Sequence, residues 1–183
     1  PVVKDGATVL IEDTDYELSY VDNINVGTAT ITITGKGNYN GTKAVTFNIT
    51  LAALTITADD KAKVFGEADS TLTVSYTGFV NGEDASDLTG TLAVSRIVGE
   101  SVDTYAITAS GLASTNYAIT YAAGTFTITS KSITDTDITV APIAELVYTG
   151  LGQTPSPVVK DGATVLIEDT DYELSYVDNI NVG

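Results

Sequence analysis

The chain has 183 residues, of which 43% are hydrophobic, and its 24 acidic and 8 basic residues give a formal net charge of −16 at pH 7. This charge disfavours nucleic acid and anionic membranes as partners, whereas the hydrophobic content is enough for a folded core. Cys, Met, Trp and His are all absent, which excludes disulfides, cysteine zinc sites and histidine general bases. No apolar run reaches the length of about 18 residues that a membrane-spanning helix needs.

The chain opens and closes with the same 27 residues, PVVKDGATVLIEDTDYELSYVDNINVG, at positions 1–27 and 157–183. Repeats that only fold alike drift apart in sequence, so identity indicates a recent tandem duplication. The simplest interpretation is a repeat unit of 156 residues, followed by the first 27 residues of the next unit. We therefore expect this sequence to be a window on a longer array.

The 156-residue unit divides into two related halves. GNYNGTKAVTFNIT (residues 37–50) and TNYAITYAAGTFTIT (residues 115–129) share Asn-Tyr and then Thr-Phe-x-Ile-Thr. Asn38 and Asn116 lie 78 positions apart, which is half of the unit. We name the two halves domain A and domain B.

The predicted boundaries leave domain A incomplete at both ends of the sequence. They are 1–52 for the closing part of one domain A, 53–130 for a complete domain B, and 131–183 for the opening part of the next domain A. A half-domain exposes unpaired strand edges and apolar faces. We expect neighbouring repeats of the same chain, or neighbouring chains, to complete these halves.

Period-two alternation predicts strands along most of the chain. Residues 28–35 (TATITITG), 71–78 (TLTVSYTG) and 104–111 (TYAITASG) alternate apolar and polar side chains and are rich in β-branched residues. Turn signals separate them, and residues 85–88 (ASDL) suit a single helical turn. We expect an all-β fold of small, antiparallel, Ig-like β-sandwich domains in tandem. The short joints contain no Gly/Ser-rich or Pro-rich linker, which favours an extended rod.

Acidic clusters near the domain joints are the only candidates for metal binding. Calcium takes six to eight oxygen ligands, often from closely spaced carboxylates. The candidate residues are Asp59, Asp60, Asp135 and Asp137. No complete EF-hand loop is present, and the joint cores TLAAL (residues 50–54) and TSKSI (residues 129–133) contain no carboxylate. The alternative is that these residues are solvated polar side chains and that the chain needs no cofactor.

No catalytic motif is complete, so we predict that the chain is not an enzyme. The ten Tyr residues leave two alternatives open. Tyr39 and Tyr117 occupy equivalent positions in domains A and B, which favours a buried ring with its hydroxyl on the backbone. Tyr side chains could instead stack against sugar rings or anchor a partner.

The motifs of domain A resemble a repeat that is common in large bacterial surface proteins. The matching residues are Tyr148-Thr149-Gly150; Asp15-Tyr16, Tyr20 and Asn23 running into Gly27-Thr28-Ala29; Asp171-Tyr172, Tyr176 and Asn179 in the second copy; Gly37-Asn38-Tyr39 with Gly41; and Phe47-Asn48-Ile49. These motifs are similar to YDG-like Ig-like repeats.

Domain B resembles the companion MBG, or "mostly β", domain. The similarity lies in ADDKAKVFGEADSTLTVSYTGFVNGED, then DTYAIT, then NYAITYAAGTFTIT. The sequence departs from the family at Val102-Asp103, where the family usually has Val-Gly, so the resemblance does not fix the turn geometry there. Together, the two resemblances cover nearly the whole chain.

The resemblance implies a non-catalytic, extracellular segment of a giant bacterial cell-surface adhesin, including adhesins that serve gliding motility. We expect a stalk or adhesive filament that attaches to surfaces such as polysaccharides. The alternative is a carbohydrate-binding or protein-binding module, and a further one is an accessory domain of a large surface enzyme. The resemblance transfers no catalytic residue to this chain.

Overall fold

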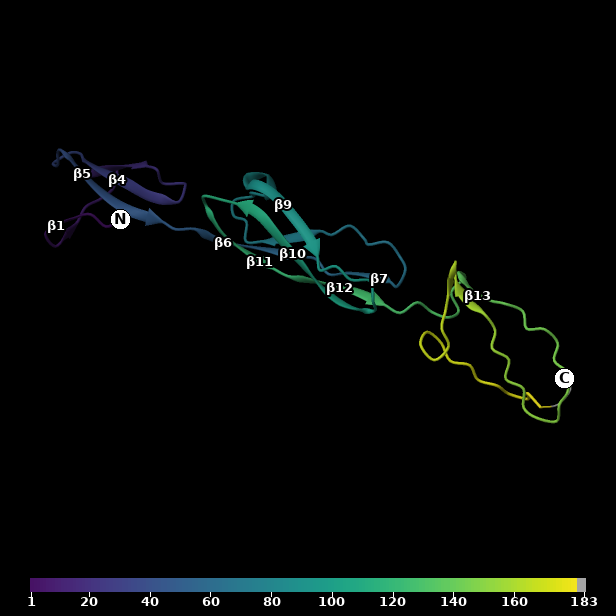
Figure 1. Ribbon diagram of the computed structural model, residues 1–183. Coiled ribbons are helices and arrows are strands. Elements are labelled where there is room, and N and C mark those ends of the chain that lie inside the picture. Colours follow the sequence, from purple (N-terminus) through teal and green to yellow (C-terminus); the bar gives the residue numbers. More distant parts are fainter. Residues whose placement is uncertain (181–183) are drawn as a thin grey trace. The chain divides into compact units, whose positions relative to one another are not determined.

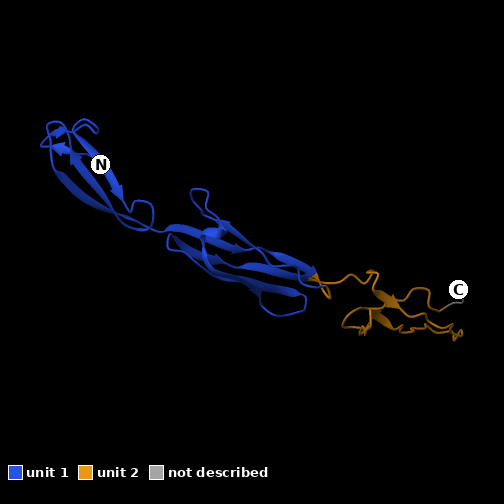
Figure 2. Cartoon of the chain, turned by 90° about the horizontal axis from the view of Figure 1, so that it is seen from above, with its two compact units in different colours: residues 1–63, 68–128 blue, residues 64–67, 129–183 orange. Residues whose placement is uncertain are grey.

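The computed structural model describes residues 1–180. The last three residues of the second 27-residue copy, which belong to the predicted segment 131–183, lie outside the described residues. The chain divides into two compact units, shown in Figure 2: unit 1 comprises residues 1–63 and 68–128, and unit 2 comprises residues 64–67 and 129–183. The described secondary structure is almost entirely β-strand, which confirms the predicted all-β class.

The closing part of domain A forms one three-stranded antiparallel sheet. Its order is β3 (Tyr16–Val21), β4 (Gly27–Gly35) and β5 (Thr42–Ile49), and a short hairpin of β1 (Lys4–Asp5) and β2 (Thr8–Val9) precedes it. In antiparallel pairs, residues directly opposite each other share a face. Figure 1 labels β4 and β5 near the N-terminus.

One face of this sheet is apolar, because β4 alternates as the sequence predicted. Ile31 lies opposite Tyr20 on β3 and opposite Val45 on β5, and Ala29 lies opposite Phe47. The Thr side chains of β4 occupy the other face. Val45, Phe47 and Tyr20 are exposed in unit 1.

Domain B consists of two sheets. The first has the order β7 (Lys61–Val64), β12 (Gly124–Thr129), β10 (Asp103–Ala113) and β9 (Thr89–Arg96), and the second has the order β11 (Tyr117–Ala122), β6 (Ala52–Ala58) and β8 (Val74–Thr77). Most of these strands are labelled in Figure 1. The predicted turn at residues 85–88 is confirmed as the 3₁₀ helix η1 (Ala85–Asp87), with Asp84 as its capping residue.

Two buried clusters form the core of domain B. Leu54, Ile56, Leu88 and Tyr117 form one of them, against which Val74 and Tyr76 pack. Ala58, Ile107, Phe126 and Ile128 form the other, against which Leu72 and Val94 pack. Each cluster joins the opening strands of the domain to its closing strands, so neither half of domain B buries its apolar face alone.

One strand pair differs from the antiparallel pairing that we expected throughout. β6 and β11 run parallel, from Ala52 opposite Tyr117 to Thr57 opposite Ala122. Parallel neighbours need a long crossover connection. The chain between β6 and β11 contains β7 to β10, which supplies it. Alternating hydrophobicity predicts a strand but does not show whether its neighbour runs parallel or antiparallel. The pattern therefore did not reveal this pair.

Unit 2 contains a three-stranded sheet of β13 (Ile138–Val140), β14 (Val159–Asp161) and β15 (Thr164–Val165). The two copies of the 27-residue segment form the same hairpin, because Lys4 lies opposite Val9 in the first copy and Lys160 lies opposite Val165 in the second. In the second copy this hairpin pairs with β13. The hairpin is thus the same in both copies, whereas Tyr16–Val21 form strand β3 and the matching residues 172–177 form no strand.

A β-bulge in domain B depends on glycine. The register of β10 against β9 shifts between Ser110 and Leu112, and Gly111 has φ +96°. A Cβ added there would lie 2.1 Å from the carbonyl oxygen of Thr91. Only glycine combines this conformation with such a close approach of the backbone.

We predict that Gly111→Ala destabilises the chain strongly. Both the left-handed conformation and the clash with Thr91 contribute, and their sum is about 2–5 kcal/mol in the free energy of unfolding. Gly82→Ala is the matched control, because Gly82 has φ +78° with open space around it, and it should lose only about 1–2 kcal/mol. Urea unfolding followed by tyrosine fluorescence measures both. Equal losses would contradict the role of the close approach.

Candidate functional site

Asn116 lies where domain A meets domain B within unit 1. Its side-chain oxygen accepts from the Val26 amide at 3.1 Å, and its side-chain nitrogen donates to Asn25 Oδ1 at 2.9 Å. Its backbone carbonyl accepts from the amide of Ala52, the first residue of β6, at 3.0 Å. One residue thus binds the loop before β4 and the strand that leaves the joint. The sequence singled out Asn116 as half of an Asn-Tyr repeat, but it gave no reason to expect this contact.

A small hollow of about 170 Å³ adjoins this joint, and Asn116, Tyr117 and Glu83 are among its lining residues. The Tyr117 ring is buried, and its hydroxyl accepts from the Val80 amide at 3.1 Å and donates to the Glu83 carboxylate. The hydrogen bond to Glu83 raises the pKa of the Tyr117 hydroxyl. Within the hollow, the Tyr117 hydroxyl and the Asn116 side chain are already hydrogen-bonded to neighbouring groups.

Tyr39, the counterpart of Tyr117 in domain A, has a different environment. Its ring is only half-buried, and its hydroxyl donates to Asp5 at 3.3 Å instead of to a backbone group. Burial, with the nearby charge of Asp5, raises the pKa of Tyr39. The expected equivalence of the two tyrosines therefore holds for sequence position but not for contacts.

Four charged residues form a network beside the loop that connects β9 and β10 of domain B. Lys63 and Arg96 are the cations, and Asp69 and Glu100 are the anions. Arg96 Nε lies 2.6 Å from Asp69 Oδ2, and Lys63 Nζ lies 2.8 Å from Asp69 Oδ1. The guanidinium of Arg96 also stacks 4.7 Å from the centre of the Phe126 ring.

Both cations of this network are buried, whereas the two carboxylates remain partly exposed. The hydrogen bonds from Arg96 and Lys63 lower the pKa of Asp69 to about 2. Those from Lys63 and Arg96 also lower the pKa of Glu100. The two carboxylates therefore neutralise the charges of two buried cations next to Phe126. This is a structural role that requires no ligand.

The calcium candidates of domain B already serve as hydrogen-bond acceptors. Asp59 accepts from the hydroxyls of Thr73 at 2.5 Å and Ser75 at 2.6 Å, and these bonds lower its pKa. Asp60 accepts from the Thr125 amide at 2.7 Å. Each carboxylate thus ties an opening strand of domain B to a neighbouring segment.

The calcium candidates of unit 2 lie around a cation of the chain itself. Lys131 Nζ is 3.3 Å from Asp137, 3.8 Å from Asp135 and 2.7 Å from Asp161. The hydrogen bond to Asp161 raises the pKa of Lys131. Among residues 1–180, no group of three or more acidic residues has the geometry to hold a metal ion. Calcium binding stays a prediction.

The comparison with known families identifies the middle of the chain. Residues 54–127 match the family model described as "MBG domain (YGX type)". This segment is an MBG domain. No curated protein and no solved structure matches the chain. The match covers the two-sheet domain with the Arg96 network, and the resemblance of this segment to MBG domains is thereby confirmed.

Asp103 stands at the position where the sequence of the MBG domain departs from the Val-Gly of the family. Asp103 begins β10 opposite Ile128, just as Gly27 begins β4 opposite Ile49 in domain A. Gly27 has φ +148°, whereas Asp103 is not among the residues with positive φ, and its carboxylate accepts from the Thr104 amide at 2.7 Å. The backbone conformation therefore differs between Gly27 and Asp103, while the position in the strand register is the same. Within the described residues, no helix is long and apolar enough to span a membrane.

We predict that the Asp69 network makes the MBG domain sensitive to acid. A carboxyl whose folded pKa is about 2, below its ordinary value, stabilises the fold above about pH 4 and loses this effect as the pH falls towards 2. Asp69→Asn should lower the melting temperature at pH 7 and flatten its dependence on pH between 5 and 2. Asp22→Asn is the control, because Asp22 is exposed. If the melting temperatures of Asp69→Asn and of the original chain fell equally between pH 5 and pH 2, this role would be contradicted.

We also predict that Asn116→Ala opens the joint locally. The Val26 amide loses its acceptor, and a hydrogen bond worth about 1 kcal/mol corresponds to roughly five- to tenfold faster exchange. The Ala52 amide is an internal control, because it is bonded to the backbone carbonyl of residue 116, which the substitution keeps. Hydrogen exchange measured by NMR resolves the two amides. Unchanged protection at Val26 would show that the Asn116 side chain does not hold the joint.

Proposed function

We propose that this chain is a structural repeat segment of a very large, secreted bacterial surface adhesin. It would act as the stalk or filament that carries or multiplies weak surface attachments, including those used in gliding. Multivalency then raises the strength of attachment without a strong site in any one repeat. The MBG domain, the β-rich fold and the repeated 27-residue segment support this proposal.

The observation that carries the proposal is that the chain builds the same sheet twice. In domain A the order is β3, β4, β5, and in the MBG domain the corresponding order is β9, β10, β12. The registers agree, because Ala29 opposite Phe47 corresponds to Tyr105 opposite Phe126. Duplicated sheets joined by short connections are typical of arrays that extend by adding units.

The chemistry of the described residues agrees with a structural role. The acidic side chains near the joints accept hydrogen bonds from their own domain. In the Arg96 network, Asp69 and Glu100 pair with Lys63 and Arg96. The excess of acidic residues keeps identical neighbours apart in solution and blunts edge-to-edge association. We propose an extracellular location at the bacterial cell surface, with neighbouring repeats of the same chain and surface polysaccharides as partners.

A carbohydrate-binding or protein-binding module is the second candidate. Tyr148, in the Tyr-Thr-Gly motif of domain A, exposes 59% of its surface, as an aromatic platform for a sugar ring would. In the MBG domain, by contrast, Tyr117 is buried, and Tyr76 and Tyr121 pack against the core. The candidate contact is therefore confined to domain A. Loss of glycan binding in Tyr148→Ala but not in Tyr121→Phe would favour this second function.

Antibodies raised against the chain test the adhesin proposal. On intact cells of the bacterium that produces it, we expect antibody labelling at the outer surface, removal of the label by external protease, and weaker attachment of cells to glass when antibody fragments are added. A control antibody against a cytoplasmic protein should label only lysed cells. Labelling of the chain only after lysis would contradict the proposal.

A further inference from the structure

The strand β11 (Tyr117–Ala122) lies at an edge of the MBG domain. In the sheet of order β11, β6 and β8, its one neighbour within the described residues is β6. The register between the two strands runs without interruption from Tyr117 to Ala122, and Figure 1 labels them next to each other. An edge strand presents unpaired backbone groups, which proteins normally protect with charge, short length, proline or a bulge.

The backbone groups of every second residue of β11 point away from β6. The Asn116 carbonyl, one residue before the strand, accepts from the Ala52 amide of β6 at 3.0 Å. Because backbone groups alternate in direction along a strand, the even-numbered residues of β11 also face β6. The odd-numbered residues face outward, and these are Tyr117, Ile119 and Tyr121. β11 can therefore form hydrogen bonds with a further strand.

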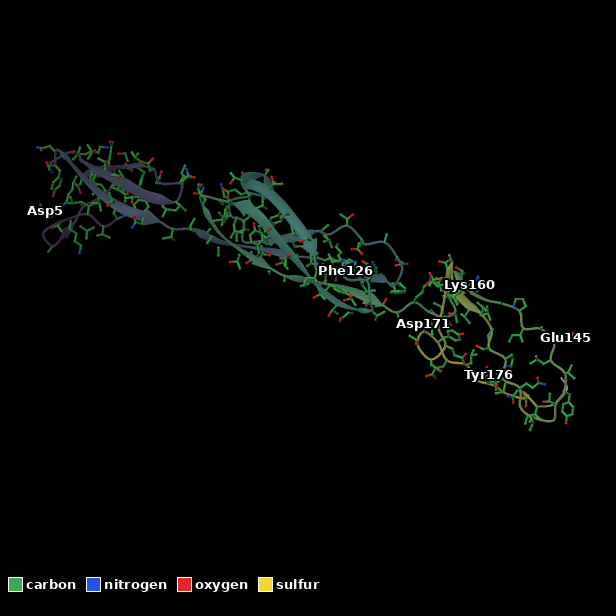
Figure 3. The ribbon with its side chains drawn as sticks, viewed as in Figure 1. Asp5, Phe126, Glu145, Lys160, Asp171 and Tyr176 are labelled. Carbon is green, nitrogen blue, oxygen red and sulfur yellow. The ribbon has the colours of Figure 1, made fainter. Side chains whose placement is uncertain are left out.

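The strand lies in a charge-free stretch of the sequence. Residues 104–130 contain no Asp, Glu, Lys or Arg, although 17% of the chain is charged. The stretch includes all of β11 and all of β12 with Phe126, which Figure 3 labels. β11 also contains no proline. Charged side chains and proline, two of the usual protections of an edge, are therefore missing from β11.

The other described edge strands of the MBG domain each carry a protection that β11 lacks. β7 has four residues, and two of them are Lys61 and Lys63. β9 ends in Arg96, and a bulge interrupts its register against β10. β8 has four residues, and the carboxylate of Asp59 accepts a hydrogen bond from its Ser75 hydroxyl. Among these described edges, only β11 combines six residues with an uninterrupted register and no charge.

The sequence of β11 is complementary to itself when two copies pair antiparallel. With the two-fold axis at Ile119, the two Ile119 residues lie opposite each other, and Tyr117 lies opposite Tyr121 of the second copy. On the solvent side, Ala118 lies opposite Thr120 of the second copy, and both side chains are exposed. The pairing therefore brings no like charges together, which would destabilise a cross-strand pair.

We propose that β11 pairs antiparallel with β11 of a second copy, so that two chains join side by side through their MBG domains. Each copy contributes the same strand, so the interface is isologous and closes at two domains. The acidic excess opposes association over most of the surface, and β11 is the edge at which this opposition is weakest. The proposal does not depend on the adhesin function.

Salt should strengthen the pairing of β11. Two copies with a formal net charge of −16 each repel one another, and added salt screens this repulsion. The proposed contact consists of backbone hydrogen bonds and neutral side chains, which salt does not screen. We therefore expect the fraction of dimer to rise with sodium chloride, whereas an association held by opposite charges would weaken.

Two matched variants of the full chain test the proposal by sedimentation velocity. Thr120 and Thr77 are exposed and lie in one row of the sheet, on either side of Thr55. Thr120→Glu places a charge on the β11 edge, and Thr77→Glu places the same charge on the β8 edge. The original chain and Thr77→Glu should form a dimer and nothing larger. Thr120→Glu should weaken the dimer roughly tenfold or more, because like charges then meet at the interface.

Engineered cysteines test the register of the pair, because the chain has no cysteine of its own. Chains with Ala118→Cys and chains with Thr120→Cys are mixed and mildly oxidised. The two Cβ atoms should lie opposite each other in a non-hydrogen-bonded pair, about 4.5–5.5 Å apart, which suits a disulfide. Mass spectrometry should therefore find the mixed disulfide dimer. Chains with Ala118→Cys mixed with chains with Thr77→Cys are the control and should give far less.

Four results would overturn the proposal. The first is an original chain that stays monomeric at every concentration and salt level. The second is equal association of Thr120→Glu and Thr77→Glu while their melting temperatures show that both are folded. The third is a mixed disulfide yield no higher than that of the control mixture. The fourth is growth beyond the dimer, which would place the contact on another surface.

Discussion

The need to cover the apolar face of one sheet is the constraint on which the MBG domain depends. The buried side chains on that face, Ile107, Phe126 and Ile128, each contribute about 1.5–3 kcal/mol when they leave water. Their cover comes from residues such as Ala58 and Leu72, which lie 35 to 70 positions earlier in the chain. The domain therefore folds only when its first and last strands meet. In domain A, by contrast, the apolar face of the β3–β4–β5 sheet keeps exposed side chains such as Phe47.

The small number of basic residues limits where ion pairs can form in the rest of the structure. With only 8 basic residues against 24 acidic ones, seven of the eight ion pairs of the described residues involve the largely buried cations Lys63, Arg96 and Lys131. Arg96 stacks on Phe126 and holds Asp69 and Glu100, and Lys131 gathers three carboxylates in unit 2. Several other acidic residues accept hydrogen bonds from backbone amides or hydroxyls, as Asp59 and Asp60 do. Much of the charge excess thus has a local structural use.

Period and repetition in the sequence predicted the strands, the apolar face of β4 and the internal duplication, because these depend on neighbouring residues. They did not predict the parallel pair β6 and β11, since alternation carries no direction. They also missed the Arg96 network, whose members lie up to 37 positions apart and meet only in the folded domain. Acidic residues near the joints predicted a metal, but spacing alone does not distinguish a cation site from carboxylates bonded to hydroxyls and amides.

The parallel pairing of β6 and β11 has a mechanical consequence. β6 enters the domain from the joint, and β11 leads through a single residue into the last strand, β12. Tension applied between the two ends of the domain therefore pulls these neighbours past each other along their length. All six residue pairs between Ala52–Thr57 and Tyr117–Ala122 then bear the load together, instead of opening one after another like a zip. Stretching a domain of this topology therefore loads the hydrogen bonds between β6 and β11 in shear.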